Sequence, residues 1–249
     1  LYAAAPSEAG CSEDSANYNL ILRSVWALQH LCRKEQLLYR STSAWLNKLV
    51  DSQIVAFTCT LPRRYPDQRK LLTRVSFLLS AVAYALVEAI EQGTARGSTL
   101  RLDPHEQLAQ LLPALAFCLQ VAPEAPLPTP GAEVHEAAAL ALGDACVDAT
   151  LGRSAVELGV LDGLVRALKE QSEAIAFRAN AVWAIHKLYQ IGDPSSRALI
   201  QTSGAASACE RVLKEKMTKA HLGATKAKSV EASVARMLDG QGENLTQFV

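Results

Sequence analysis

The chain has 249 residues, of which 49% are hydrophobic but only 6% are aromatic, and Ala and Leu carry most of the apolar weight. Such a composition favours close-packed helices over sheets, and the length allows one large domain or two small ones. Lys and Arg together number 25, as do Asp and Glu, so the formal net charge is zero. No global field therefore draws the protein toward nucleic acid or an anionic membrane, which argues against a dedicated nucleic-acid binder.

The cysteines lie far apart in the sequence, with no Cys-x-x-Cys pair, and most fall within apolar helical patterns. They are Cys11, Cys32, Cys59, Cys118, Cys146 and Cys209. Buried free thiols in a reducing compartment fit this pattern better than the alternative, a disulfide framework. We expect an intracellular protein, either cytoplasmic or, after removal of a transit peptide, located in an organelle such as the mitochondrion.

Two charge-free apolar stretches, 75–87 and 107–123, bear on membrane association. Both are shorter than the roughly 20 apolar residues that a membrane span needs. Residues 1–16 show neither the basic start nor the apolar core of a signal peptide. We therefore predict buried helices and no transmembrane segment.

Pro and Gly residues punctuate a series of helical patterns along the chain. The patterns predict helices at 17–33, 36–49, 67–92, 105–121, 133–149, 153–158, 160–170, 173–190, 195–202, 205–217 and 224–238. No stretch alternates apolar and polar residues as a half-buried strand would. The expected fold class is all-α.

A proline-rich run separates two helical halves. It spans 123–130, has four prolines in eight residues, and cannot be helical. This run either marks a domain boundary or forms a loop between two stacked layers. The two halves have similar compositions, which favours the loop. The predicted organisation is an irregular segment at 1–16, divergent helical repeats at 17–121, a Pro-rich loop at 122–132, regular repeats at 133–238 and a C-terminal tail at 239–249.

The C-terminal half contains an internal repeat with an offset of 43 to 45 residues. Residues 138–171 align with 181–216, and a third copy of one helix signature appears as VWALQHLC at 25–32 against VWAIHKLY at 182–189. The alignment places Ala141 on Ala184, Gly159 on Gly204 and Leu168 on Leu213. Gly at the turn permits a sharp crossing, and small residues allow successive helices to stack. A single unit cannot bury its own apolar face, so neighbouring units must stack.

These motifs resemble the armadillo repeat family, in particular RSAVELGVLDGLVRAL at 153–168 followed by RANAVWAI at 178–185. The resemblance covers 133–216, continues in degenerate form over 224–238, and leaves 17–121 as a divergent cap or HEAT-like portion. It implies a right-handed α-solenoid whose third helices line a concave groove for peptides or partner domains.

One departure narrows what the resemblance implies. In the importin-like branch, an Asn four residues after a Trp of the third helix clamps an extended peptide. The Trp positions here are Trp26, Leu140 and Trp183, and the Asn positions are His30, Asp144 and Lys187. None of these is Asn, so recognition of nuclear-import cargo does not follow.

The partner-binding groove is predicted to be lined by seven residues: His30, Asp144, Asp148, Arg178, Asn180, His186 and Lys187. Asp144 and Asp148 lie one helical turn apart, as some general acid–base pairs do, but a solvated groove face is the stronger interpretation. The histidines lack metal-ligand spacing, and no nucleotide-binding motif occurs. We therefore predict no catalytic residue, no cofactor and no metal site.

Two basic clusters complete the set of candidate features. They are Arg63, Arg64, Arg69, Lys70 and Arg74, and Lys214, Lys216, Lys219, Lys226 and Lys228. Neither is interleaved with aromatic residues, so a base-stacking RNA surface is not expected. A solvated charged edge is the leading interpretation, and acidic protein, lipid headgroups and RNA phosphate are the alternatives.

The sequence thus predicts a non-enzymatic protein–protein interaction scaffold or adaptor that is a stable subunit of a larger multiprotein complex, with other proteins as its partners. The alternative is a nucleotide-exchange cofactor of the Hsp70 chaperones, because armadillo solenoids of similar size serve in that role. An enzyme would require a compact pocket with converging polar groups.

Overall fold

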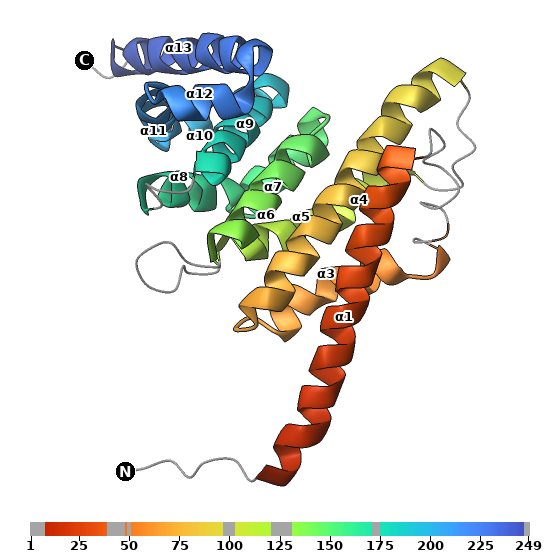
Figure 1. Cartoon of the computed structure of the whole chain (residues 1–249). Coiled ribbons are helices and arrows are strands. Elements are labelled where there is room, and N and C mark those ends of the chain that lie inside the picture. Colours follow the sequence, from red (N-terminus) through yellow and green to blue (C-terminus); the bar gives the residue numbers. More distant parts are fainter. Residues whose placement is uncertain are drawn as a thin grey trace, which may run out of the picture.

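The computed structural model describes residues 8–38, 48, 51–96, 103–120, 131–170 and 175–246. The described residues form twelve helices and no strand (Figure 1), which confirms the all-α expectation for this part of the chain. The helices are α1 (Glu8–Leu38), α3 (Ile54–Arg64), α4 (Arg69–Arg96), α5 (Pro104–Gln120), α6 (Gly131–Ala145), α7 (Ala149–Glu157), α8 (Val160–Glu170), α9 (Ile175–Ile191), α10 (Pro194–Thr202), α11 (Ala205–Leu213), α12 (Lys216–Leu222) and α13 (Ala224–Thr246).

The ends of the helical region differ from the expectation. Residues 8–16 belong to α1 and residues 239–246 belong to α13, so the irregular segment and the tail were predicted too long. These stretches lack the apolar face on which the prediction relied, but their residues tolerate a helix. They extend α1 and α13, whose other turns pack against the core. The N-terminal half of α1 extends away from the other helices in Figure 1.

Three internal differences have local causes. α3 was missed because Pro62 was taken as a breaker, whereas it lies near the end of the helix, which continues only to Arg64. The predicted helix at 205–217 is divided between α11 and α12 by a tight turn after Leu213. α6 begins at Gly131, inside the predicted 122–132 loop, and most of the predicted 36–49 helix lies outside the described residues.

The helices pack in two layers. α4, α6 and α9 lie side by side in one layer, with α1 beside α4 and α13 beside α9 (Figure 1). α5, α8 and α11 follow one another in the second layer, and α3 packs against α5. One continuous hydrophobic core runs from Val25 in α1 to Met237 in α13. The chain segment between α5 and α6 therefore joins helices of a single core.

Two successive three-helix units are visible in this arrangement. Helices of 15, 9 and 11 residues (α6, α7, α8) are followed by helices of 17, 9 and 9 residues (α9, α10, α11). Gly159 and Gly204 occupy equivalent turns with φ of 75° and 81°. A Cβ at Gly204 would meet nothing within 4 Å, so positive φ, and not close approach of two helices, explains this glycine.

Polar contacts between neighbouring units repeat with the helices. The Arg166 guanidinium of α8 donates to the Gln120 carbonyl at the end of α5, at 3.1 Å. Arg211, the equivalent residue of α11, donates to the Leu168 carbonyl near the end of α8, at 3.2 Å. Each arginine satisfies a carbonyl that the end of a helix leaves unpaired. The units are thus joined by the same polar contact as well as by apolar packing.

Helix α4 is the only helix of the described residues that is long and apolar enough to cross a membrane by length and composition, over Arg69–Glu91. The sequence-based estimate considered a shorter apolar run. In the structure, 61% of that window is buried, and α1, α3, α5 and α6 pack around the helix. α4 is the central core helix of the N-terminal half.

Candidate interaction groove

Two adjoining cavities cross the layer formed by α1, α4, α6 and α9. The first has a volume of about 250 Å³ and is lined by Gln29, Phe77, Ser80, Ala81, Tyr84, Leu140 and Asp144. The second, of about 440 Å³, is lined by Tyr84, Val87, Glu88, Ile90, Glu91, Gly143, Asp144, Val147, Trp183 and Lys187. Tyr84 and Asp144 line both cavities, which are therefore neighbours, and the two together are called the groove below.

Helical spacing explains how these side chains meet. Glu88 follows Tyr84 by four residues on α4, Asp144 follows Leu140 by four on α6, and Lys187 follows Trp183 by four on α9. Residues three or four apart share one face of a helix. Three adjacent helices thus present equivalent faces to the same groove.

Close packing of α6 against α9 sets the position of the groove tryptophan. A Cβ on Gly143 would lie 2.9 Å from Cδ1 of Trp183 and 3.4 Å from the Cα of Ala184. Contacts this short exclude a larger residue unless the helices move apart. Gly143 therefore lets the indole ring lie flat against α6, where its exposed part forms one wall of the groove.

The groove carries both signs of charge. Burial raises the pKa of the Asp144 carboxyl to about 6, although Lys226 and Lys187 act in the opposite direction. Lys226 reaches this region from α13, where its Nζ lies 4.6 Å from the centroid of the Trp183 ring. The carboxyl is mostly ionised at neutral pH and gains a proton on mild acidification.

Asp144 and Lys187 are the two predicted groove residues that line the groove. His30 is exposed on α1, and its ring centroid lies 4.6 Å from that of Trp26. Leu140 and Trp183, which occupy the Trp positions of the repeat, both line cavities. The positions that the repeat register selected on α6 and α9 thus lie on the faces that line these cavities.

Three other predicted groove residues hold helices together instead. Arg178 is only 8% exposed and forms an ion pair with Glu215, at 2.8 Å. Asn180 donates to the Glu136 carbonyl of α6 at 3.3 Å. Asp148 caps the N-terminus of α7 and lies 2.8 Å from Nδ1 of His105. Their place in the groove was wrongly predicted, because each side chain reaches the neighbouring helix instead of the hollow.

His186 was also wrongly placed in the groove. It is 1% exposed because α13 covers α9 at this point, and its Nδ1 lies 2.9 Å from the Ser233 hydroxyl. Burial, followed by the charges of Lys187 and Arg236, lowers its pKa to about 4. A substrate cannot reach this Ser–His pair, and the neutral imidazole is a weak base, so the contact is structural.

Four of the described cysteines are thiols that are not activated as nucleophiles. They are Cys59, Cys118, Cys146 and Cys209. Burial raises the pKa of Cys59, Cys146 and Cys209 to about 12 and that of Cys118 to about 11. A thiol that stays protonated is a poor nucleophile. Among the described residues, no group of three His, Cys, Asp or Glu side chains is arranged to hold a metal ion.

Sequence reasoning missed the α4 wall of the groove and the approach of α13 to Trp183. Tyr84 is one of two aromatic residues of α4, seven residues after Phe77, and Glu88 and Glu91 follow it by four and seven residues. That amphipathic strip was the available signal. Lys226 was assigned only to a basic cluster, because nothing in the sequence shows that α13 folds back over Trp183.

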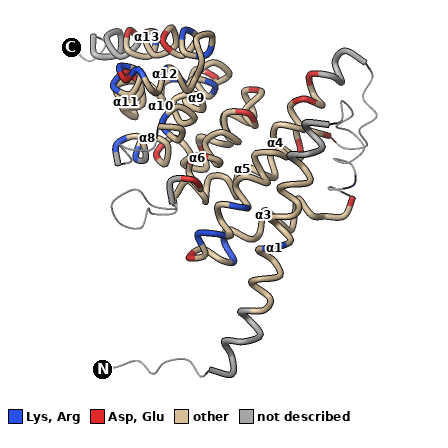
Figure 2. The backbone as a smooth tube through the Cα atoms, in the orientation of Figure 1, with Lys and Arg blue, Asp and Glu red and all other residues tan. Residues whose placement is uncertain are grey.

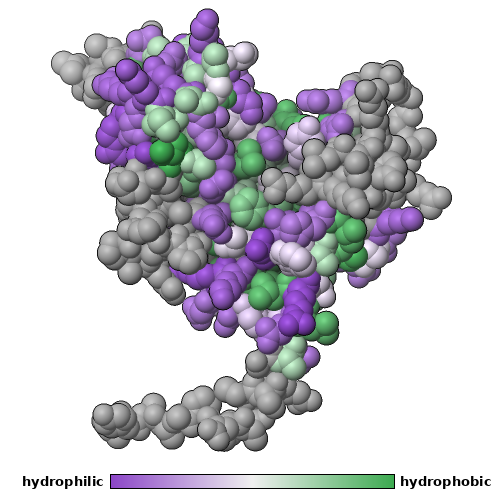
Figure 3. Space-filling model, viewed as in Figure 1, coloured by the Kyte–Doolittle hydropathy of each residue, from purple (hydrophilic) through white to green (hydrophobic). Residues whose placement is uncertain are grey.

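Charge and hydropathy are distributed unevenly over the surface. Lys and Arg gather on α8 and α11–α13 and at the turn into α4 (Figure 2). Hydrophobic side chains lie over the α4–α6 region in the middle of the face shown in Figure 3, whereas the C-terminal helices are mainly hydrophilic there. Tyr84, which lines both cavities, is 52% exposed, and Trp26 on α1 is 47% exposed.

Comparison of the chain with protein-family models, with curated proteins and with solved structures gives no match in any of the three.

Proposed function

We propose that the protein is a non-enzymatic protein–protein interaction scaffold, built as an armadillo-like α-solenoid and acting as a subunit of a larger assembly. Its groove holds an extended segment of another protein. The observation that carries this proposal is the pair of neighbouring cavities over α1, α4, α6 and α9, in which α4, α6 and α9 present equivalent faces.

The walls of the groove have the composition of a protein-binding surface. Exposed aromatic residues are over-represented where proteins bind one another, and Tyr84 and Trp183 both line the larger cavity. Asp144 and Lys187 add polar groups beside them. A hollow that is open along several helices suits an extended chain, whereas small-molecule sites enclose most of their ligand.

The case against catalysis rests on the described titratable groups. Asp144 and His186 have pKa values shifted in opposite directions, as an acid–base pair would, but His186 is buried beneath α13 and does not line the groove. Shifted pKa values also arise in structural contacts. The groove is lined by aromatic side chains and by isolated charged side chains, and such groups are suited to binding.

Two charge reversals test the proposal by co-purification. Lys187→Glu alters the groove, and Lys169→Glu makes the same change at an exposed position of α8. We expect Lys187→Glu to lose a partner that the unmodified chain retains in quantitative mass spectrometry, while Lys169→Glu retains it. Thermal unfolding of both variants controls for folding, since exposed substitutions usually change stability by less than about 0.5 kcal/mol. Equal recovery with both variants contradicts binding in the groove.

A further inference from the structure

Two lysines lie over the same tryptophan at the C-terminal end of the groove. The Lys226 Nζ lies 4.6 Å and the Lys187 Nζ 6.0 Å from the centroid of the Trp183 ring. They come from different helices, α13 and α9, so folding brings the two ammonium groups together. Two like charges near one ring are favourable only where counter-charge or solvent offsets their repulsion.

Two other lysines of this half of the chain have ion-pair partners. Lys214 pairs with Glu210 at 3.1 Å and Lys219 pairs with Glu231 at 2.5 Å. Among the described residues, no carboxylate lies within ion-pairing distance of Lys187 or Lys226. Both lysines act to lower the pKa of the carboxyl group of Asp144, which lines both cavities. The two ammonium groups thus present unmatched positive charge at the rim.

We propose that Lys187 and Lys226 bind an acidic side chain of the partner segment, whose neighbouring apolar residue enters the groove beside Trp183. This inference rests on the proposed function and names the chemistry of the partner: an extended peptide with Asp or Glu next to an apolar residue. Two ammonium donors suit a carboxylate, and the indole face suits an aliphatic side chain.

The opposite wall of the larger cavity favours an apolar or basic part of the segment. Glu88 and Glu91 line this cavity from α4, so acidic residues are already present on that side. The acidic residue of the partner therefore lies at the α9–α13 end, and the part of the segment that crosses α4 is apolar or basic. Charge complementarity thus favours one end of the groove for the acidic residue.

Fluorescence anisotropy with three labelled peptides tests this proposal. Each peptide has about 12 residues, long enough to extend over roughly 40 Å, and alternates Leu with Ser except near one end, where two of the Ser positions carry Glu, Lys or Ser. We expect the Glu–Leu peptide to bind about tenfold or more tightly than the Lys–Leu peptide, with an affinity that falls as salt is added. Tighter binding of the Lys–Leu peptide overturns the proposal but leaves a peptide-binding groove in place.

Two charge-reversal variants of α13 test whether the preference for the acidic peptide arises at Lys226. Lys226→Glu should weaken binding of the Glu–Leu peptide about tenfold or more, whereas Lys228→Glu makes the same charge change on α13 and should weaken it less than about threefold. Equal weakening by both variants shows a diffuse charge effect and overturns the proposal. If none of the three peptides binds, the acidic-residue site is overturned, and the cross-linking described in the Discussion decides separately whether the groove binds protein.

Discussion

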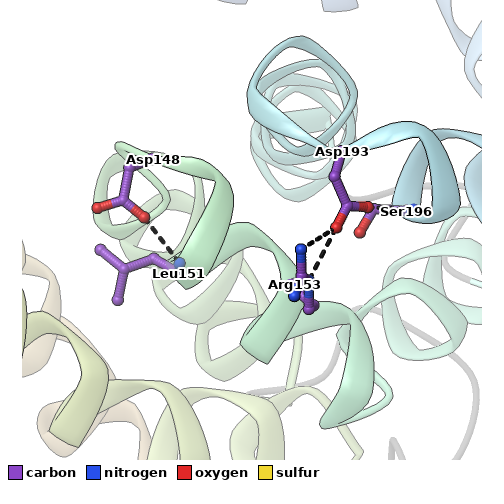
Figure 4. A network of polar contacts seen from close by, with 5 residues as sticks. All are labelled: Asp148, Leu151, Arg153, Asp193 and Ser196. Carbon is purple, nitrogen blue, oxygen red and sulfur yellow. Dashed lines mark hydrogen bonds and ion pairs between the residues drawn. The ribbon is translucent and has the colours of Figure 1, made fainter.

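Asp148 and Asp193 hold the same position in two successive units. Each carboxylate accepts a hydrogen bond from the backbone of the short helix that it begins, at 2.9 Å from the Leu151 nitrogen and 2.8 Å from the Ser196 nitrogen (Figure 4). Each also contacts a basic side chain from an earlier helix: His105 for Asp148, and Arg153 of α7 for Asp193. The N-caps thus link neighbouring units as well as starting their helices.

Asp148→Ala should destabilise the fold by about 0.5–2 kcal/mol, because the first turn of α7 loses its side-chain cap. The exposed contact with His105 adds little, since surface ion pairs contribute about 0–1 kcal/mol. Urea unfolding followed by circular dichroism measures the change. Asp148→Asn, which can still accept the hydrogen bond, should retain most of the stability, and an equal loss in both variants argues against the capping role.

Gly204→Val should destabilise the C-terminal unit by about 1–3 kcal/mol, because a β-branched residue is strained at positive φ. The space around this position is open, so the loss comes from the backbone and not from a clash. Gly204→Asn has a side chain of comparable size but tolerates the left-handed region. It should therefore melt closer to the unmodified chain than Gly204→Val does, and identical melting temperatures for the two variants contradict the explanation.

Asp144→Asn should make the protein more stable at neutral pH. The folded chain holds the Asp144 proton up to a pKa of about 6, whereas an unfolded Asp releases it near 4. Stability from this group is therefore present below about pH 4 and is lost as pH rises through 6. The variant stays neutral, so its free energy of unfolding should exceed that of the unmodified chain by about 2–3 kcal/mol at pH 7 and match it near pH 4. If the difference in free energy of unfolding between the variant and the unmodified chain stays constant with pH, ionisation of Asp144 is not its cause.

His186 should titrate far below the usual range. Its pKa is lowered to about 4 by burial and by neighbouring cations, so it contributes stability above pH 6.5 that is lost as pH falls toward 4. Carbon-13 chemical shifts of the imidazole, followed from pH 7.5 to pH 4, measure this directly. A midpoint near about 6.5 shows that α13 does not cover the ring in solution.

Much of the C-terminal half was predictable because its signals are local. Positive φ at Gly159 and Gly204, and the burial of Ala141 and Ala184, follow from an alignment of the chain with itself. The roles of Arg178 and His186 were not predictable in this way. The partner of Arg178, Glu215, precedes α12 at the very end of the aligned segment, and the partner of His186, Ser233, lies on α13 beyond it. A residue on the groove side of a helix is available only if no later helix packs over it.

Site-specific photo-cross-linking tests the central claim, that partners bind in the groove, most directly. Benzoylphenylalanine introduced in place of Tyr84 reports on the groove, and the same residue in place of Leu199 on α10 is the control, since the two side chains are 52% and 51% exposed. The account predicts cross-linked partner bands from position 84 and none from position 199 in native lysate. Bands from position 199 alone, or of equal yield from both positions, contradict it.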